Sequence, residues 1–233
     1  MAAGVFLVAG GSIRAAEEQA RPEASGERWR LPAPEAPTLS EVFAASPRDG
    51  AATGFLLAQL PRGKPLLWVQ ERMAMLEAGR IYPPGLGLGE LIHVAARDAR
   101  TALWAMEEGL RCLALGAVIG EIWGDPKALD FTATRRLAVA AERYGVAAFL
   151  IRLGGHANLS GARMRWRVGS APSLPHPLDP KAPGTAAWDA ELFRARGFAP
   201  GRLVVRHDGA ADRLDLVAAA GDRTLVESER RVG

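Results

Sequence analysis

The sequence predicts a single α/β domain, built around a mostly parallel β-sheet with helices on its faces. Three observations support this prediction: short apolar runs typical of buried strands, amphipathic segments of helical periodicity between them, and capping residues where helices should begin or end. Strands and helices that alternate in this way imply right-handed crossovers and parallel pairing. The 233 residues suffice for one well-packed domain and do not require a second.

The predicted elements begin at residue 39 and follow one another closely. We expect strands over residues 39–45, 66–70, 91–95, 115–119 and 146–151. A helix over residues 51–60 follows the first strand, and Asp98 and Asp130 each cap a later helix. Gly145 ends the helix that Asp130 begins, because glycine readily adopts the left-handed conformation of a helix C-terminus.

After residue 154 the pattern changes to strands without intervening helices. Strands are expected over residues 163–168, 188–195, 203–207 and 214–218, with a proline-rich excursion over residues 170–184. This succession of strands without helices predicts an antiparallel extension at the C-terminal end of the same sheet. We therefore divide the chain into an N-terminal arm and linker (1–38), the α/β domain (39–225) and a flexible tail (226–233).

The N-terminal arm has two weak signals of its own. A strand over residues 5–8 is followed by Gly10-Gly11-Ser12 and a helix over residues 13–20, and four prolines follow within residues 21–37. No second strand follows at βαβ spacing, so a phosphate site there is disfavoured. An arm that packs on a neighbouring molecule and a lightly docked terminus both stay open.

Composition excludes several classes of protein. The formal net charge of +3 permits contact with nucleic acid or an acidic protein but demands neither. Cys112 is the only cysteine, so no intramolecular disulfide is possible, and we expect its side chain to be buried where a helix ends. Apolar runs are too short for a transmembrane helix, and the N-terminus lacks the basic residue of a signal peptide, so we expect a cytoplasmic protein. Histidines are too dispersed for a metal site, and no cofactor is expected.

One strand–turn–helix connection has the context of a phosphate-binding P-loop, G-x-x-x-x-G-K-[ST]. It comprises Ala45, Arg48, Asp49, Gly50, Ala51, Ala52 and Thr53. Only the second glycine survives, as Gly50; the lysine position is Ala51 and the magnesium-binding hydroxyl position is Ala52. Loss of that lysine and hydroxyl removes most of the stabilisation of a transferred phosphoryl group. Arg48 and Thr53 are at the wrong positions in the motif to replace the lysine and the hydroxyl. Taken alone, this segment also fits an ordinary strand–turn–helix connection.

Three arginines alternate with apolar residues in the strand after residue 162. Arg163, Arg165 and Arg167 should lie on one face of that strand, and Met164, Trp166 and Val168 on the other. No acidic residue occurs from Arg143 to Leu178, so we expect a locally uncompensated basic patch. The patch would contact an acidic partner or DNA phosphates, with protein favoured; the alternative is a solvated edge strand protected by its charges.

The order of elements resembles that of the RecA core, and several short sequence motifs are more specific than this order. Residues 65–71 are similar to the RecA strand that ends on a catalytic glutamate, here Glu71, and residues 112–121 to the Walker B strand, here ending on Glu121. The chain resembles the ImuA family over residues 39–219. The phrases specific to that family are Val69-Gln70, Gly79-Arg-Ile-Tyr-Pro-Pro-Gly85, Leu103-Trp-Ala-Met-Glu-Glu108, Gly120-Glu-Ile-Trp-Gly124 and Leu129-Asp-Phe-Thr-Ala-Thr-Arg-Arg136.

This resemblance implies a RecA-like P-loop NTPase core and a role in DNA damage-induced translesion synthesis. Implied partners are the polymerase-like protein ImuB, an error-prone replicative-type DNA polymerase and RecA, with weak or indirect DNA contact. We expect a non-enzymatic adaptor in which Glu71 and Glu121 are remnant carboxylates or structural caps. Trp123, just beyond a strand end, is the aromatic residue best placed for a contact surface, whereas Trp68, Trp104 and Trp166 are expected in the core or on the sheet. The alternatives are a residual nucleotide-dependent switch or ATPase and a direct DNA-binding module.

Overall fold

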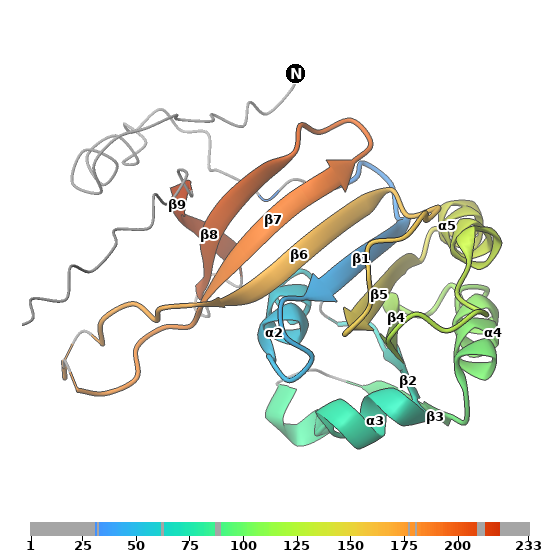
Figure 1. Ribbon diagram of the computed structural model, residues 1–233, viewed down its shortest axis with the longest axis horizontal. Helices are drawn as coiled ribbons and strands as arrows, with labels where there is room; N and C mark the ends of the chain where they lie inside the picture. The colour runs from blue at the N-terminus through green and yellow to red at the C-terminus, as the bar shows by residue number, and fades with distance from the viewer. Residues whose placement is uncertain are drawn as a thin grey trace, which may run out of the picture.

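A nine-stranded sheet forms the centre of the molecule, with the strand order β3-β2-β4-β5-β1-β6-β7-β8-β9 (Figure 1). The computed structural model describes residues 31, 33–61, 63–86, 90–176, 178–179, 181–208 and 213–219. The strands are β1 (Leu39–Ala44), β2 (Leu66–Glu71), β3 (Leu91–Ala96), β4 (Ala117–Trp123), β5 (Ala147–Leu153), β6 (Met164–Ala171), β7 (Ala187–Ala195), β8 (Gly201–Asp208) and β9 (Arg213–Ala219). The helices are α2 (Ala51–Leu57), α3 (Arg72–Ala78), α4 (Ala99–Gly109), α5 (Phe131–Tyr144) and the 3₁₀ helix η1 (Pro83–Leu86).

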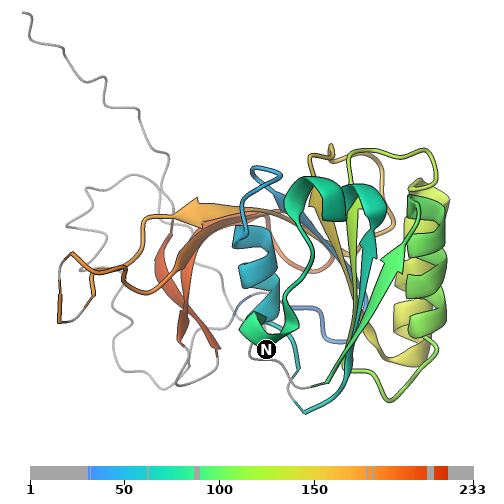
Figure 2. The same cartoon turned by 90° about the horizontal axis from the view of Figure 1, so that it is seen from below.

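The helices cover the two faces of the sheet as two outer layers. Helices α2 and α3 lie on one face and α4 and α5 on the other (Figure 2). Each face has its own apolar cluster, one around Phe55, Trp68 and Trp166, the other around Met106 and Leu150. Strands β2, β4 and β5 contribute alternate residues to both clusters, which explains their continuous apolar sequences.

Local sequence signals for the helix ends are confirmed. The carboxylate of Asp98 accepts a hydrogen bond from the Thr101 N–H at 2.7 Å, and the carboxylate of Asp130 accepts one from the Ala133 N–H at 2.7 Å. Gly145 ends α5 with φ of 68°, in the left-handed region that favours glycine. The strands expected from residue 39 onward and the helices after residues 50, 98 and 130 are all present. Helix α3, directly after β2, was not predicted.

The C-terminal extension requires one correction. Strands β7, β8 and β9 pair antiparallel as expected, but β6 pairs parallel with β1. Residues 154–163 connect β5 to β6 without forming a helix. Because the sequence there has no helical pattern, β6 is predicted to be antiparallel to its neighbours, and for its pairing with β1 this prediction is wrong. Strands β7 to β9 curve toward the face that holds α2 (Figure 2). The Trp188 ring of β7 packs so closely against Gly54 of α2 that a Cβ at that position would lie 2.9 Å from it.

The N-terminal arm and the tail over 226–233 fall almost wholly outside the described residues. The strand predicted over 5–8, the Gly10-Gly11-Ser12 turn and the helix over 13–20 all belong to that part of the chain. Of the arm, only residues 31 and 33–38 are described, and Leu31 packs against the apolar cluster around Trp68 and Trp166.

Candidate functional site

In the connection between β1 and α2, which has the context of a P-loop, the carboxylate of Asp49 accepts hydrogen bonds from nearby protein groups. Asp49 Oδ1 accepts hydrogen bonds from the Ala51 N–H at 2.9 Å and the Ser170 hydroxyl at 2.7 Å, and Asp49 Oδ2 accepts one from the Ser170 N–H at 2.9 Å. Partial burial acts to raise the pKa of Asp49, but the hydrogen bonds from Ser170 and Ala51 outweigh it and lower that pKa. An aspartate anion therefore binds the first N–H group of α2, at the place where a P-loop presents N–H groups to phosphate.

The remaining residues of this connection have no phosphate-binding geometry. Gly50 has φ of −69°, and Ala51 and Ala52 are 3% and 1% exposed, packed in the apolar cluster beneath α2. Arg48 is exposed and Thr53 is half-buried within the seven-residue helix. The N-terminal turn of α2 is thus packed against the sheet by small apolar side chains where a P-loop has its lysine and hydroxyl.

Glu121 lies inside a hydrogen-bonded network on the α3 side of the sheet. Its two oxygens accept hydrogen bonds from Trp68 Nε1 at 2.8 Å and Gln70 Nε2 at 2.7 Å. Gln70 Oε1 in turn accepts one from the Ile81 N–H at 3.0 Å and lies 3.0 Å from His93 Nε2. Burial raises the pKa of Glu121 against the opposing effect of both hydrogen bonds. Burial, with a smaller contribution from the charge of Arg80, lowers the pKa of His93.

Glu71 has a separate environment, although it ends the neighbouring strand. It is 7% exposed, and its Oε2 accepts a hydrogen bond from the backbone N–H of Trp123 at 3.0 Å. The two carboxylates therefore bind different protein groups, and each hydrogen bond joins β2 to β4. This arrangement suits structural groups better than a shared metal site, and no group of three His, Cys, Asp or Glu side chains suited to a metal ion occurs within the described ranges.

Asp125 links the connection after β4 to the end of β5 and the connection that follows it. Its Oδ1 accepts hydrogen bonds from Arg152 Nη2 at 2.6 Å and the His156 N–H at 3.0 Å, and its Oδ2 lies 2.6 Å from His156 Nδ1. Burial acts to raise the pKa of Asp125, and the hydrogen bonds from His156 with the charge of Arg152 more than offset it, so the pKa is lowered. Arg152 Nη2 also donates to the Gly124 carbonyl at 3.1 Å. The connections after β4 and β5 are therefore bound to each other.

The arginines of β6 are not an uncompensated patch, which corrects the sequence prediction. Arg165 is 3% exposed and donates to Glu41 Oε2 at 2.7 Å, with Glu41 fully buried. Arg163 donates to Glu142 at 2.7 Å, and Arg167 to Glu191 at 3.0 Å. The carboxylates come from β1, α5 and β7, so the acid-free stretch of sequence is neutralised by residues distant in the chain.

Alternation along β6 is nevertheless confirmed, since Met164, Trp166 and Val168 are buried on the α2 side. The opposite face of β6 is lined by ion pairs and by aromatic rings that stack on guanidinium groups. The Arg165 guanidinium lies 5.2 Å from the ring centroids of both Phe43 and Phe193. Only Arg163 and Arg167, the two outer arginines, keep exposed surface for an external contact.

Three aromatic or thiol residues lie elsewhere than predicted. Trp123 is the last residue of β4, half-buried against the apolar cluster beneath α3, and not in a loop. Trp104 was expected in the core, but its side chain is 61% exposed on α4. Cys112, expected to be buried, is exposed in the turn after α4.

Comparison with known proteins identifies the family to which these features belong. Protein ImuA from two strains of Caulobacter vibrioides is 33% identical over 221 aligned residues, which cover 83% of this chain and 86% of the relative. The chain belongs to the ImuA family. No protein-family model matches it.

Family membership confirms the resemblance on which the sequence prediction rested. The fold of this ImuA-family chain, a large mostly parallel sheet between helices, is compatible with a RecA-like core. Among its described helices, none has both the length and the apolar character to cross a bilayer. The groups that sequence reasoning missed are Asp49 as the partner of α2 and Asp125 as the clamp between two connections, because both depend on contacts with distant strands.

Proposed function

We propose that this chain is a non-enzymatic, RecA-like adaptor of the bacterial mutasome, acting in translesion synthesis after DNA damage. Its partners would be an ImuB-type polymerase-like protein and an error-prone replicative-type DNA polymerase, with RecA as a further candidate. Membership of the ImuA family supports the pathway. The observation that best supports a binding role without catalysis is the carboxylate of Asp49 at the first turn of α2, with alanines at the lysine and hydroxyl positions.

Electrostatics explain why this arrangement disfavours nucleotide. A triphosphate at the first turn of α2 would meet a carboxylate already bonded to three donors and would find no lysine or magnesium-binding hydroxyl. The two carboxylates at the neighbouring strand ends, Glu71 and Glu121, accept hydrogen bonds from protein donors. The sheet edge that binds nucleotide in related folds is therefore occupied by contacts within the protein.

Thermal unfolding with and without nucleotide tests the non-enzymatic part of the proposal. A ligand at one hundred times its dissociation constant stabilises a folded protein by about 2.7 kcal/mol. We expect no shift in melting temperature with millimolar MgATP or MgADP. A shift that saturates with nucleotide and disappears when Gly50 is replaced by a bulky residue would establish a nucleotide site and contradict the proposal.

Affinity purification tests the adaptor part. Tagged chain is recovered from cells with damaged DNA, and co-purifying proteins are identified by mass spectrometry. Recovery of an ImuB-type protein or an error-prone polymerase supports the assignment. If neither is recovered from cells shown to express both, the assigned pathway is wrong, although the fold is unaffected.

A further inference from the structure

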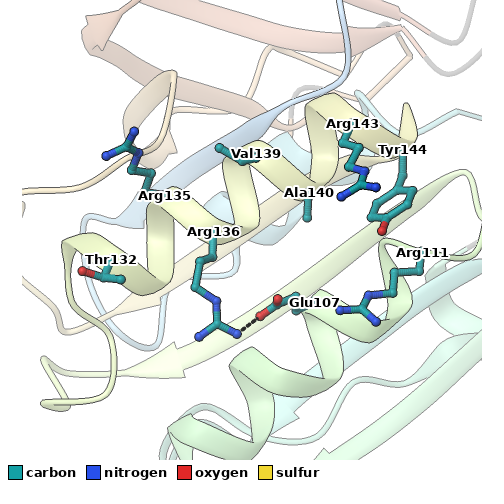
Figure 3. Close-up of a pocket in the computed structure, with 9 residues that line it drawn as sticks. All are labelled: Glu107, Arg111, Thr132, Arg135, Arg136, Val139, Ala140, Arg143 and Tyr144. Carbon is teal, nitrogen blue, oxygen red and sulfur yellow. Dashed lines mark hydrogen bonds and ion pairs between the residues drawn. The ribbon is translucent and has the colours of Figure 1, made fainter.

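A groove of about 300 Å³ runs between α4 and α5 on the outer side of the molecule (Figure 3). The two helices pack on the same face of the sheet and leave the groove between their exposed flanks. Its lining comprises Glu107, Arg111, Thr132, Arg135, Arg136, Val139, Ala140, Arg143 and Tyr144. None of these residues belongs to the segments compared with the P-loop (45–53) or the Walker B strand (112–121).

Positive charge predominates in this groove. Four of its side chains are arginines and one is a carboxylate, Glu107, which is paired with Arg136 (Figure 3). Arg111 has a carboxylate 3.6 Å away, on Glu108 of the same helix. Arg135 and Arg143 form no ion pair with any of the described residues, and Arg143 rests 5.4 Å from the ring centroid of Tyr144. Two guanidinium groups are thus available to an external anion.

Apolar side chains are exposed near these arginines, on the outer sides of both helices. Val139 is 47% exposed and lies on α5 between Arg135 and Arg143, four residues from each. Trp104, 61% exposed, precedes Glu107 by three residues, which places both on the same flank of α4. Tryptophan and arginine are the residues most enriched among the energetic centres of protein interfaces.

We propose that the α4–α5 groove binds an acidic segment of a partner protein. Carboxylates of that segment pair with Arg135 and Arg143, an apolar side chain covers Val139, and Trp104 packs at the rim. Arg135 and Arg143 are eight residues apart, or about 12 Å along the axis of α5. The two carboxylates should therefore be about eight residues apart in a helical segment, or about four in an extended one.

The chemistry of the groove favours protein over nucleic acid. Glu107 and Glu108, on the α4 side, pair with Arg136 and Arg111 and so reduce the positive charge that a phosphate backbone would meet there. Between Arg135 and Arg143, the exposed side chain is the apolar Val139. A peptide can avoid those carboxylates by placing neutral residues beside them, whereas every nucleotide carries a charge. This inference rests on the proposed function only in that the chain binds protein partners, and it does not depend on which partner binds.

A designed peptide tests the groove directly. The probe is a fluorescein-labelled helical peptide with two glutamates eight residues apart and a leucine midway between them; its control has the same composition in permuted order. Fluorescence anisotropy should show binding to the full chain, at least tenfold weaker for the permuted peptide. Replacing both Arg135→Ala and Arg143→Ala should weaken binding at least tenfold, and Val139→Asp should do the same. Equal binding of the two peptides, or unchanged binding by these variants, would refute the proposal.

Matched controls separate the groove from general charge effects. Arg72→Ala with Arg194→Ala removes two exposed arginines from other faces and should change affinity less than twofold. Because all the replaced side chains are exposed, urea unfolding should show unchanged stability for each variant. A sixteen-nucleotide oligothymidylate should bind more weakly than the peptide. If it binds more tightly and loses affinity through Arg135 and Arg143, the groove is a nucleic-acid site and the proposal is wrong.

A photo-crosslinking amino acid at position 139 extends the test to cells with damaged DNA. Adducts that map to an Asp- and Glu-rich segment of a protein support the proposal, whereas adducts with nucleic acid, or none at position 139, contradict it. Failure of this proposal is distinguishable from failure of the mutasome assignment. An Arg135→Ala, Arg143→Ala chain that still recovers the polymerase-like partner would reject the groove alone, whereas a wild-type chain that recovers no mutasome protein would reject the assignment.

Discussion

Replacing Glu41 by glutamine should destabilise the domain strongly, because this carboxylate compensates two buried arginines. Glu41 is fully buried, and Arg165 and Arg152 are 3% and 4% exposed. Glu41 Oε2 accepts the 2.7 Å hydrogen bond from Arg165, and Glu41 Oε1 lies 3.8 Å from Arg152 Nη1. Burial lowers the pKa of Arg152, and the charges of Glu41 and Asp125 act against that shift.

The size of the effect follows from what each arginine retains. In Glu41→Gln, Arg152 keeps Asp125 at 2.6 Å, but Arg165 keeps only the Asn158 carbonyl at 2.8 Å and two aromatic rings. Removing one partner of a buried ion pair typically costs about 3–5 kcal/mol. Glutamine preserves the volume of the side chain, so a cavity adds little. With a urea m-value of about 2 kcal/mol/M, the midpoint of unfolding should fall by about 1.5–2.5 M.

Urea unfolding followed by circular dichroism measures this cost, and two further variants isolate its cause. Glu191→Gln removes the carboxylate that pairs with Arg167, which lies on β6 like Arg165. Both side chains of this pair are exposed, so the change should cost less than about 1 kcal/mol. Adding Arg165→Met to Glu41→Gln should restore most of the lost stability, because no unpaired buried guanidinium is left. If Glu41→Gln costs no more than Glu191→Gln, the buried ion pair does not stabilise the sheet and the reasoning is refuted.

Further predictions concern the carboxylates and the glycines. Asp49→Ala should cost about 1 kcal/mol in urea unfolding at pH 7; because the pKa of Asp49 is lowered by folding, its contribution is lost as pH falls through that pKa, and the gap to wild type should close in acid. The pKa of Glu121 is raised by folding, so its stabilising contribution is lost as pH rises through that pKa. Glu121→Gln should therefore gain stability relative to wild type as pH rises above 4.5, the ordinary pKa of glutamate; a constant difference would refute this. Gly161→Ala should cost about 1–3 kcal/mol because its Cβ would lie 2.5 Å from the Arg135 Cα. Gly50→Ala, with no atom within 4 Å, should change stability by less than about 0.5 kcal/mol in the same assay.

Sequence reasoning succeeded where the determining interaction is local. Asp98 and Asp130 cap helices through the N–H group three residues later, and Gly145 ends a helix through its own backbone conformation. It failed where the partner is distant in the chain. Arg165 and Glu41 are separated by 124 positions, and only the parallel pairing of β1 with β6 brings them together.

Trp104 illustrates a different cause of error. Leu103, Met106 and Leu110 define the buried face of α4, and Trp104 lies one residue off that pattern. Its apolar character favoured a core position, although helical periodicity placed it outside. An aromatic residue that departs from the apolar face of its helix is better interpreted as a surface residue.

Carboxylates at the carboxyl edge of this sheet bind groups of the protein itself, which is what we expect if, as proposed, the chain binds no nucleotide. Asp49 binds the first turn of α2 and β6, and Asp125 binds Arg152 and the connection after β5. Such contacts give Asp49 and Asp125 hydrogen-bond partners within the protein, so a ligand gains little by binding them. Arg135 and Arg143, in contrast, lie on the outer helices without an ion pair among the described residues. Because Arg135 and Arg143 form no ion pair with the described residues, the acidic segment that we propose can reach them without breaking an ion pair within the protein.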